Sequence, residues 1–221
     1  MLRTPVRRLV RILAEERYDV ILALCVAMVT LSAAGIDALT AASGIVGLAL
    51  ITGTLIESSA LAVSRAKAWA LLAGLGCATA IELAVVGPDD ARVSPAIVTA
   101  IGIVAVITIS RQVLSRPLPD TTSIAASACA YLLIGYSFAS LYMLIDRIAA
   151  DAFLSSGEAL TPESAVYFSF VTLTTLGFGD LTPAASSGRT LVTLEAMSGQ
   201  FYIAIAVARL VAGMATAKKD D

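Results

Sequence analysis

The sequence has no histidine, only three cysteines and few charged residues along its 221 positions. The missing histidine excludes imidazole metal sites and every mechanism in which a histidine activates serine or cysteine. Cys25, Cys77 and Cys129 each lie within an apolar run, which is typical of small buried side chains and not of a disulfide framework. A formal net charge of −2 argues against a nucleic-acid partner. Neither an enzyme nor a bound cofactor is expected.

The scarcity of charge predicts a membrane protein. Charged residues make up 14% of the chain, against about 25% in soluble domains, and apolar residues make up 58%. A transmembrane helix needs about 20 consecutive apolar residues. Six spans are predicted, at Val20–Ile36, Ser43–Val63, Ala68–Val86, Ser94–Ile109, Ser123–Ile145 and Leu191–Ala208. A further apolar segment, Ala165–Leu173, is too short to cross and is expected to enter the membrane and turn back.

Lysine and arginine are concentrated in alternate segments between these spans. The richer segments contain Arg3, Arg7, Arg8, Arg11, Arg17, Arg65, Lys67, Arg111, Arg116, Lys218 and Lys219. The opposite loops contain only Arg92, Arg147 and Arg189. By the positive-inside rule, both termini are predicted to be cytoplasmic in a plasma (inner) membrane, and the short apolar segment enters from outside.

The segment between the last two spans has a distinct helix start. Thr161 supplies a capping hydroxyl, Pro162 suits the first helical position, and Glu163 lies at the positive end of the helix dipole. A helix from Pro162 to Leu173 would rise about 18 Å, enough to reach the middle of a bilayer. The chain then has to return through Thr175–Gly179. Irregular backbone at this depth is tolerated only where it lines a water-filled or ion-filled path.

Gly177 and Gly179 alternate with residues that carry side chains, as expected if left-handed and right-handed backbone conformations alternate. The sequence Thr174-Thr175-Leu176-Gly177-Phe178-Gly179-Asp180 resembles the selectivity filter of tetrameric potassium channels, with Phe in place of the commoner Tyr. The competing interpretation is a glycine-rich turn in an external loop.

The resemblance covers roughly Ser123–Gly213 and is to short bacterial six-span proteins with a two-helix pore domain. It implies an all-α membrane protein, a homotetramer whose re-entrant pore helix and filter lie between the fifth and sixth spans. It also implies that dehydrated K⁺ is coordinated by filter residues Thr175, Leu176, Gly177, Phe178 and Gly179, through the first four carbonyls and the Thr175 hydroxyl. Thr174 would end the pore helix, and Asp180 would brace the outer mouth.

The chain then divides into four predicted parts. Residues 1–17 form a basic amphipathic helix on the inner leaflet, 18–116 a four-span bundle, 117–215 the pore domain and 216–221 a short cytoplasmic tail. A signal peptide cleaved after the first apolar run is the alternative for the amino-terminal part. It would leave an odd number of spans and disrupt the charge pattern.

The sixth span contains three features of interest. Gly199 occupies the place of the family's inner-helix hinge, but a packing notch explains a glycine there equally well. Helical periodicity predicts Gln200, Ile203, Val207 and Val211 along the cavity, with Arg209 pointing away. Glu195 lies inside the membrane. A structural hydrogen-bond role is favoured for it over pH sensing.

The first four spans lack the features of a voltage sensor. Ser94–Ser110 contains no Lys or Arg, and one charge moved through 100 mV is worth only about 2.3 kcal/mol, so steep voltage dependence has no source. Glu57 and Glu82 are expected to be polar contacts between helices, with a proton or ligand site as the alternative. Glu57 could contact Arg111. Pro117 and Pro119 disfavour a long helical linker, so the bundle is predicted to pack on its own pore domain.

The function predicted is passive K⁺ conduction without strong voltage gating. Acidic residues are expected to make the outer mouth attract cations; they are Asp146, Asp151, Glu158, Glu163 and Asp180. The few residues after Gly213 leave no room for a regulatory domain, so gating is expected from lipids, pH, ions or a separate partner. The alternatives are an ion-coupled transporter subunit that uses Glu57, Glu82 and Glu195, a non-selective cation channel, and a non-conducting membrane adaptor.

Overall fold

The computed structural model describes residues 22–30 except 24 and 28, then 93–115, 121–148 and 153–217 except 156 and 158. The second and third predicted spans, the amino-terminal helix, Glu57, Glu82, Asp151, Glu158, the two linker prolines and the end of the tail lie outside these residues. Predictions about them stay predictions.

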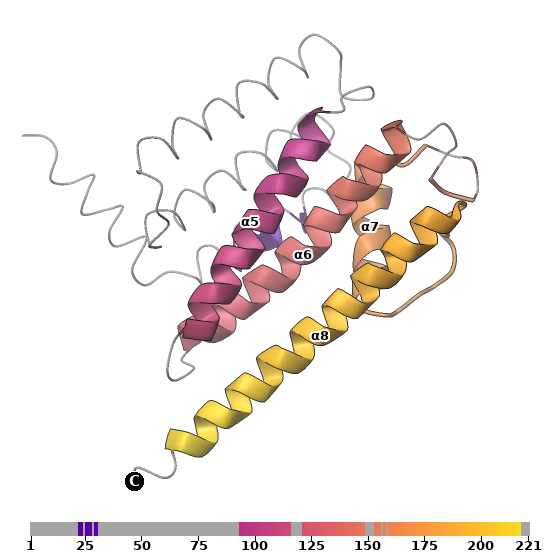
Figure 1. Ribbon diagram of the computed structural model, residues 1–221. Coiled ribbons are helices and arrows are strands. Elements are labelled where there is room, and N and C mark those ends of the chain that lie inside the picture. The colour runs from indigo at the N-terminus through magenta and orange to yellow at the C-terminus, as the bar shows by residue number, and fades with distance from the viewer. Residues whose placement is uncertain are drawn as a thin grey trace, which may run out of the picture.

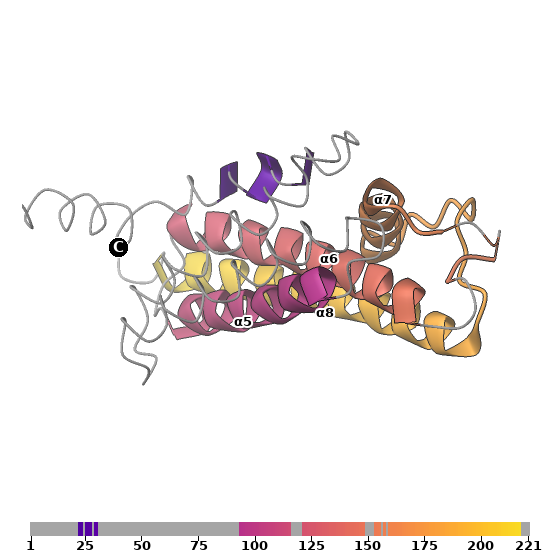
Figure 2. The same ribbon diagram turned by 90° about the horizontal axis from the view of Figure 1, so that it is seen from above.

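The described chain consists of helices joined by irregular loops. The helices are α5 (Val93–Ser115), α6 (Thr121–Ile148), α7 (Pro162–Leu173) and α8 (Ser186–Ala217), with further helical residues at 22–30. Helices α5, α6 and α8 extend along one another, and the short α7 lies beside the end of α6 and the start of α8 (Figure 1). Figure 2 shows α7 on one side of the layer that the long helices form.

Helices α5 and α6 pack through small residues. Ala105 and Ile109 of α5 and Cys129, Ala130 and Leu133 of α6 are all fully buried. Gly102 lies so close to Ser137 of α6 that a β-carbon there would overlap its hydroxyl. The buried Cys25 lies against Cys129. Helix α5, at the place of the predicted fourth span, thus packs on α6, and the packing of the whole bundle on its own pore domain stays a prediction.

Two of the described helices are long and apolar enough to cross a membrane: Ser123–Ile148 and Ser186–Arg209. They coincide with the predicted fifth and sixth spans, although both helices extend beyond the predicted ends. Pro95–Arg111 of α5 is a shorter apolar helix. Half of the most apolar stretch of α6 is buried, compared with 11% of that of α8. Helix α8 therefore presents most of its apolar surface outward.

The loops on either side of α7 are tied to each other. Ser155 N donates to Thr182 O at 2.8 Å, and Ala184 N donates to Phe153 O at 2.8 Å. The Asp146 carboxylate at the end of α6 accepts from Phe153 N (2.8 Å) and Leu160 N (3.0 Å). Asp146, which was predicted as a charge of the outer mouth, therefore also organises the loop that leads into α7.

An aromatic cluster fixes α7 against this loop and α6. The rings of Tyr142 and Phe153 have centroids 5.0 Å apart, and those of Tyr142 and Phe168 are 5.3 Å apart. Phe153 and Phe168 meet edge to face at 5.9 Å. All three side chains are buried. Such contacts hold the short α7 in place, since a helix of 12 residues is marginal on its own.

Candidate functional site

Helix α7 begins and ends where the sequence predicts. Thr161 is the N-cap: its hydroxyl accepts from Ser164 N at 3.2 Å, and the Ser164 hydroxyl accepts from Thr161 N at 2.9 Å. Pro162 follows at the first helical position, and Glu163 lies in the first turn. Thr174 is the C-cap and its hydroxyl donates to Phe170 O at 2.7 Å. Both predicted boundaries are confirmed. They could be predicted because helix capping depends on residues close together in the sequence.

The segment after α7 alternates in backbone conformation. Thr175, Gly177 and Gly179 have φ values of 59°, 56° and 81°, and each is separated from the next by a residue of ordinary φ. The expectation for the two glycines is confirmed. The positive φ of Thr175 is not apparent from the sequence, because β-branched residues strongly avoid this region. Alternation of this kind turns successive carbonyls toward the same side of the strand.

The amide groups at the start of this segment point back at α7. Thr174 N donates to Phe170 O (3.0 Å), Thr175 N to Thr172 O (2.9 Å) and Leu176 N to Val171 O (2.9 Å), and Gly177 N also reaches Val171 O at 3.3 Å. None of the carbonyls of residues 175–178 accepts a hydrogen bond from any described residue. The first N–H groups of the segment are therefore bonded to α7, whereas its carbonyl oxygens are left without a partner in the part of the chain that the structure describes.

The carboxyl end of the segment is bonded to Tyr167 of α7. Its hydroxyl donates to Asp180 Oδ2 at 2.7 Å, and its ring stacks on Phe178 at 6.4 Å with an interplanar angle of 7°. The hydrogen bond from Tyr167 lowers the pKa of Asp180 below its ordinary value, so the carboxylate stays charged. Asp180 lies at the end of the segment and is bonded to α7. This position agrees with the predicted bracing role.

A buried carboxyl group lies behind α7. Glu195 of α8 is fully buried; Tyr142 of α6 donates to its Oε2, and Ser169 of α7 contacts its Oε1. The Ser169 hydroxyl is also 2.6 Å from Gly135 O of α6. Three helices thus meet at one side chain. These contacts agree with the hydrogen-bond interpretation of Glu195, and its role in function stays a prediction.

Comparison with known proteins identifies this region. A family model described as "Ion channel" matches residues 128–215. The inward rectifier potassium channel Kirbac3.1 of Paramagnetospirillum magnetotacticum is 36% identical over 78 residues, which are 33% of this chain and 26% of that relative. The chain thus matches about a quarter of the relative's length. No solved structure gives a significant match.

The resemblance to tetrameric potassium channels is thereby confirmed at the level of the family, over the carboxy-terminal part of the chain. The match to an ion-channel family model and the two membrane-capable helices support the prediction of a membrane protein. The six-span arrangement stays a prediction.

Within the ion-channel domain, Gly199 lies where α8 touches the end of α7. A β-carbon at this position would be 2.6 Å from Leu173 O and 2.8 Å from Leu173 Cδ1. The Tyr131 hydroxyl of α6 donates to the same oxygen at 3.3 Å. Helix α8 continues through Gly199 to Ala217. Close packing alone explains this glycine, and bending at Gly199 stays a prediction.

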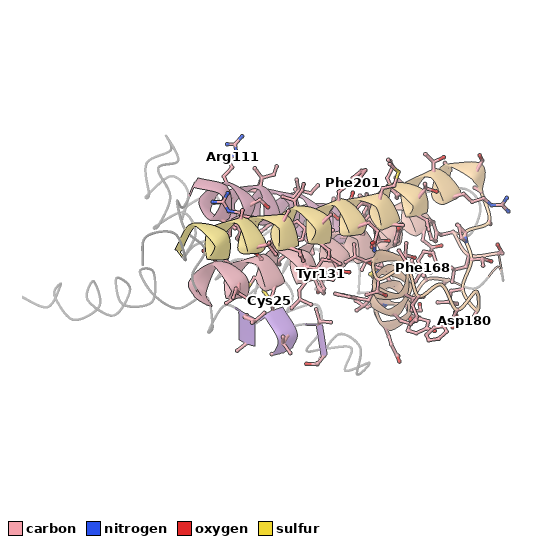
Figure 3. The ribbon with its side chains drawn as sticks, turned by 90° about the horizontal axis from the view of Figure 1, so that it is seen from below. Cys25, Arg111, Tyr131, Phe168, Asp180 and Phe201 are labelled. Atoms are coloured by element: carbon pink, nitrogen blue, oxygen red, sulfur yellow. The ribbon has the colours of Figure 1, made fainter. Side chains whose placement is uncertain are left out.

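The predicted cavity residues of α8 are not covered by α6 or α7. Gln200, Ile203 and Val207 are exposed in the single chain, whereas Glu195 and Gly199 are buried against α6 and α7. In Figure 3, Phe201 extends from the side of α8 away from α7, and it lies outside the predicted cavity face. This placement leaves the predicted cavity face free, and its role in lining a cavity stays a prediction.

Sequence reasoning missed four partners in the ion-channel domain: Tyr131, Tyr142, Tyr167 and Ser169. Each is a hydroxyl-bearing residue within an apolar helix, and a polar group there needs a partner. That signal marks such residues as candidates. It does not say which distant residue each one meets.

Proposed function

We propose that four copies of this chain assemble into a potassium-selective channel. The proposal depends above all on the row of carbonyls from Thr175 to Phe178, which accept no hydrogen bonds from the described residues. Unpaired backbone oxygens are costly inside a membrane unless a cation or water meets them. Rings of such oxygens are the groups that replace the hydration shell of a permeating K⁺.

In this mechanism the filter residues are Thr175, Leu176, Gly177, Phe178 and Gly179. The carbonyls of the first four and the Thr175 hydroxyl coordinate dehydrated K⁺, and ions move in single file by mutual repulsion between adjacent sites. The bonds from Leu176 N and Gly177 N to α7 hold the strand so that its oxygens stay on the opposite side. Asp180 adds negative charge at the outer mouth.

Each chain contributes one filter strand, so four chains are needed to close a ring of carbonyl oxygens. A single chain leaves Leu176 and Phe178 of the filter 58% and 63% exposed, and Leu194, Phe201, Ile205 and Val211 of α8 are similarly exposed. Neighbouring chains and lipid would cover these apolar side chains. Conduction would then need no bound cofactor and only the four chains, lipids and the permeant ion, whereas gating could still involve a separate regulatory partner.

Orientation and gating follow from charge. Figure 3 labels Arg111 and Asp180 at opposite ends of the helical bundle, which supports a cytoplasmic end near Arg111 and an external end near Asp180. With both termini cytoplasmic, the filter opens outward in the plasma membrane. Residues 94–110 of α5 contain no Lys or Arg, so the channel would lack strong voltage gating.

The transporter alternative depends on carboxylates that can exchange ions. Among its three candidates, Glu195 has both oxygens in contact with hydroxyl groups of other helices. A group engaged in this way is a poor carrier site. The non-selective channel alternative needs a disrupted filter, whereas the alternating φ values run without a break through Gly179.

The test is K⁺ flux into liposomes that contain the purified protein, comparing wild type with Gly177→Ala and Gly157→Ala. Both glycines have positive φ, of 56° and 76°, and an added β-carbon would meet nothing within 4 Å at either. The two substitutions therefore impose a similar kind of backbone strain, one inside the filter and one in the loop before α7. We expect Gly177→Ala to abolish flux and Gly157→Ala to retain it. Wild-type flux that is absent, or equal for K⁺ and Na⁺, would refute the proposal.

A further inference from the structure

The three oxygen–oxygen contacts around Glu195 and Ser169 restrict where hydrogen atoms can lie. Tyr142 Oη contacts Glu195 Oε2, Ser169 Oγ contacts Glu195 Oε1, and Ser169 Oγ lies 2.6 Å from Gly135 O. Each joins two oxygens at hydrogen-bonding distance. Tyr142, Ser169 and Glu195 are all fully buried. Each contact therefore needs one hydrogen between its two oxygens.

The side chains supply too few hydrogens if Glu195 is ionised. The Tyr142 and Ser169 hydroxyls carry one hydrogen each, and Gly135 O is a carbonyl that only accepts. The Ser169 hydrogen can point at Gly135 O or at Glu195, but not at both. One of the three contacts would then join two oxygens with no hydrogen, in a buried site where such a defect is costly.

A neutral carboxylic acid satisfies all three contacts with one assignment. The Glu195 hydroxyl donates to Ser169 Oγ, Ser169 donates to Gly135 O, and Tyr142 donates to Glu195 Oε2. Three hydrogens then serve three contacts. We propose that Glu195 is held as a protonated acid and acts as a positioning residue that fixes α7 between α6 and α8.

The site contains no cation that would favour the ionised form among the described residues. Tyr142 of α6 and Ser169 of α7 contact the carboxyl group through neutral hydroxyls, and Tyr131 of α6, the other titratable group near it, is bonded to Leu173 O. On α8 itself, Arg189 and Arg209 lie six and fourteen residues away along the helix. A neutral acid is thus the form that fits its neighbours on every helix packed against it.

The hydrogen bonds around Glu195 lie close enough to the filter to affect the position of its backbone. Ser169 is one turn before Leu173, the last residue of α7, and the carbonyls of Phe170, Val171 and Thr172 hold the first filter amides. A shift of α7 would therefore move the groups that position Thr175–Gly177. This consequence for conduction rests on the proposed function, whereas the protonation state does not.

The protonation state is tested by infrared spectroscopy of the purified protein near neutral pH. A protonated carboxyl group has a C=O stretching band separate from that of carboxylates. We expect this band to be lost in Glu195→Gln and retained in Glu163→Gln, a matched control at the exposed start of α7. A wild-type band that Glu195→Gln leaves unchanged would overturn the proposal, because the acid would then be elsewhere.

The positioning role is tested by the pH profile of K⁺ flux. Glutamine reproduces the neutral acid, since its amide donates to Ser169 and accepts from Tyr142. We expect wild-type flux to fall as the pH rises into the alkaline range and Glu195→Gln flux to stay level. Glu195→Ala should lower flux about tenfold at all pH values, by leaving buried hydroxyls unpaired. Parallel profiles for wild type and Glu195→Gln would overturn the positioning role. Absent wild-type flux would instead refute the proposed function and leave the infrared result standing.

Discussion

Replacing Gly199 with alanine places a methyl group where α8 touches the carboxyl end of α7. The new carbon would lie 2.6 Å from Leu173 O and 2.8 Å from Leu173 Cδ1, whereas ordinary contacts are 3.4–4 Å. The backbone oxygen cannot rotate away, so α8 or α7 has to move. Overpacking of this kind costs about 1–3 kcal/mol, and the better helix propensity of alanine returns about 1 kcal/mol. The net expectation is a loss of up to about 2 kcal/mol per chain.

Gly188→Ala is the matched control, because it lies on the same helix. Its β-carbon would be 3.1 Å from Pro183 Cβ and 3.2 Å from Phe153 Cε2, which are side-chain atoms that can yield by a few tenths of an ångström. Thermal unfolding in detergent is the assay, and a change of 1 kcal/mol corresponds to about 2–4 °C for a chain of this size. We expect Gly199→Ala to unfold at a lower temperature than both wild type and Gly188→Ala. If Gly199→Ala is as stable as wild type and only channel opening changes, the packing explanation is wrong and a hinge is favoured.

Three further predictions concern the outer mouth and α5. Tyr167→Phe keeps the ring stack on Phe178 but removes the hydrogen bond that lowers the pKa of Asp180. The stabilisation from ionised Asp180 is lost as pH falls through that lowered pKa, so acid should inhibit flux at a higher external pH in Tyr167→Phe than in wild type; identical acid profiles would contradict this. Asp146→Asn, which leaves one oxygen for two backbone donors, should reduce stability by about 1–3 kcal/mol in thermal unfolding, and an unchanged midpoint would count against its role in the loop. Planar-bilayer recordings should show open probability nearly independent of voltage, and steep voltage dependence would contradict the reasoning from α5.

Local features of the pore region could be predicted from the sequence. The ends of α7 are set by Thr161, Pro162 and Thr174, which act within a few residues of themselves. Gly177 and Gly179 indicate positive φ because few other residues adopt it readily. The predicted ends of the sixth span were less accurate. Arg189 and its polar neighbours interrupt the apolar run, whereas the helix already begins at Ser186.

Features that depend on distant partners could not be predicted. The positive φ of Thr175 contradicts its own preference and is maintained by the contacts of the folded loop. The Tyr142–Glu195 and Ser169–Glu195 contacts join residues 53 and 26 positions apart, and no local pattern specifies such pairs. The sequence could not decide between a hinge and a notch at Gly199, because the answer depends on the oxygen of Leu173 across the helix contact.

The most direct test of the conduction mechanism is to locate bound ions in crystals of the full-length protein grown with rubidium, which replaces K⁺ and scatters anomalously. The account predicts anomalous peaks on a fourfold axis, in a line between the carbonyls of Thr175, Leu176, Gly177 and Phe178 from four chains. Crystals that show this strand facing lipid, or a monomer or dimer with no rubidium at these carbonyls, would contradict it.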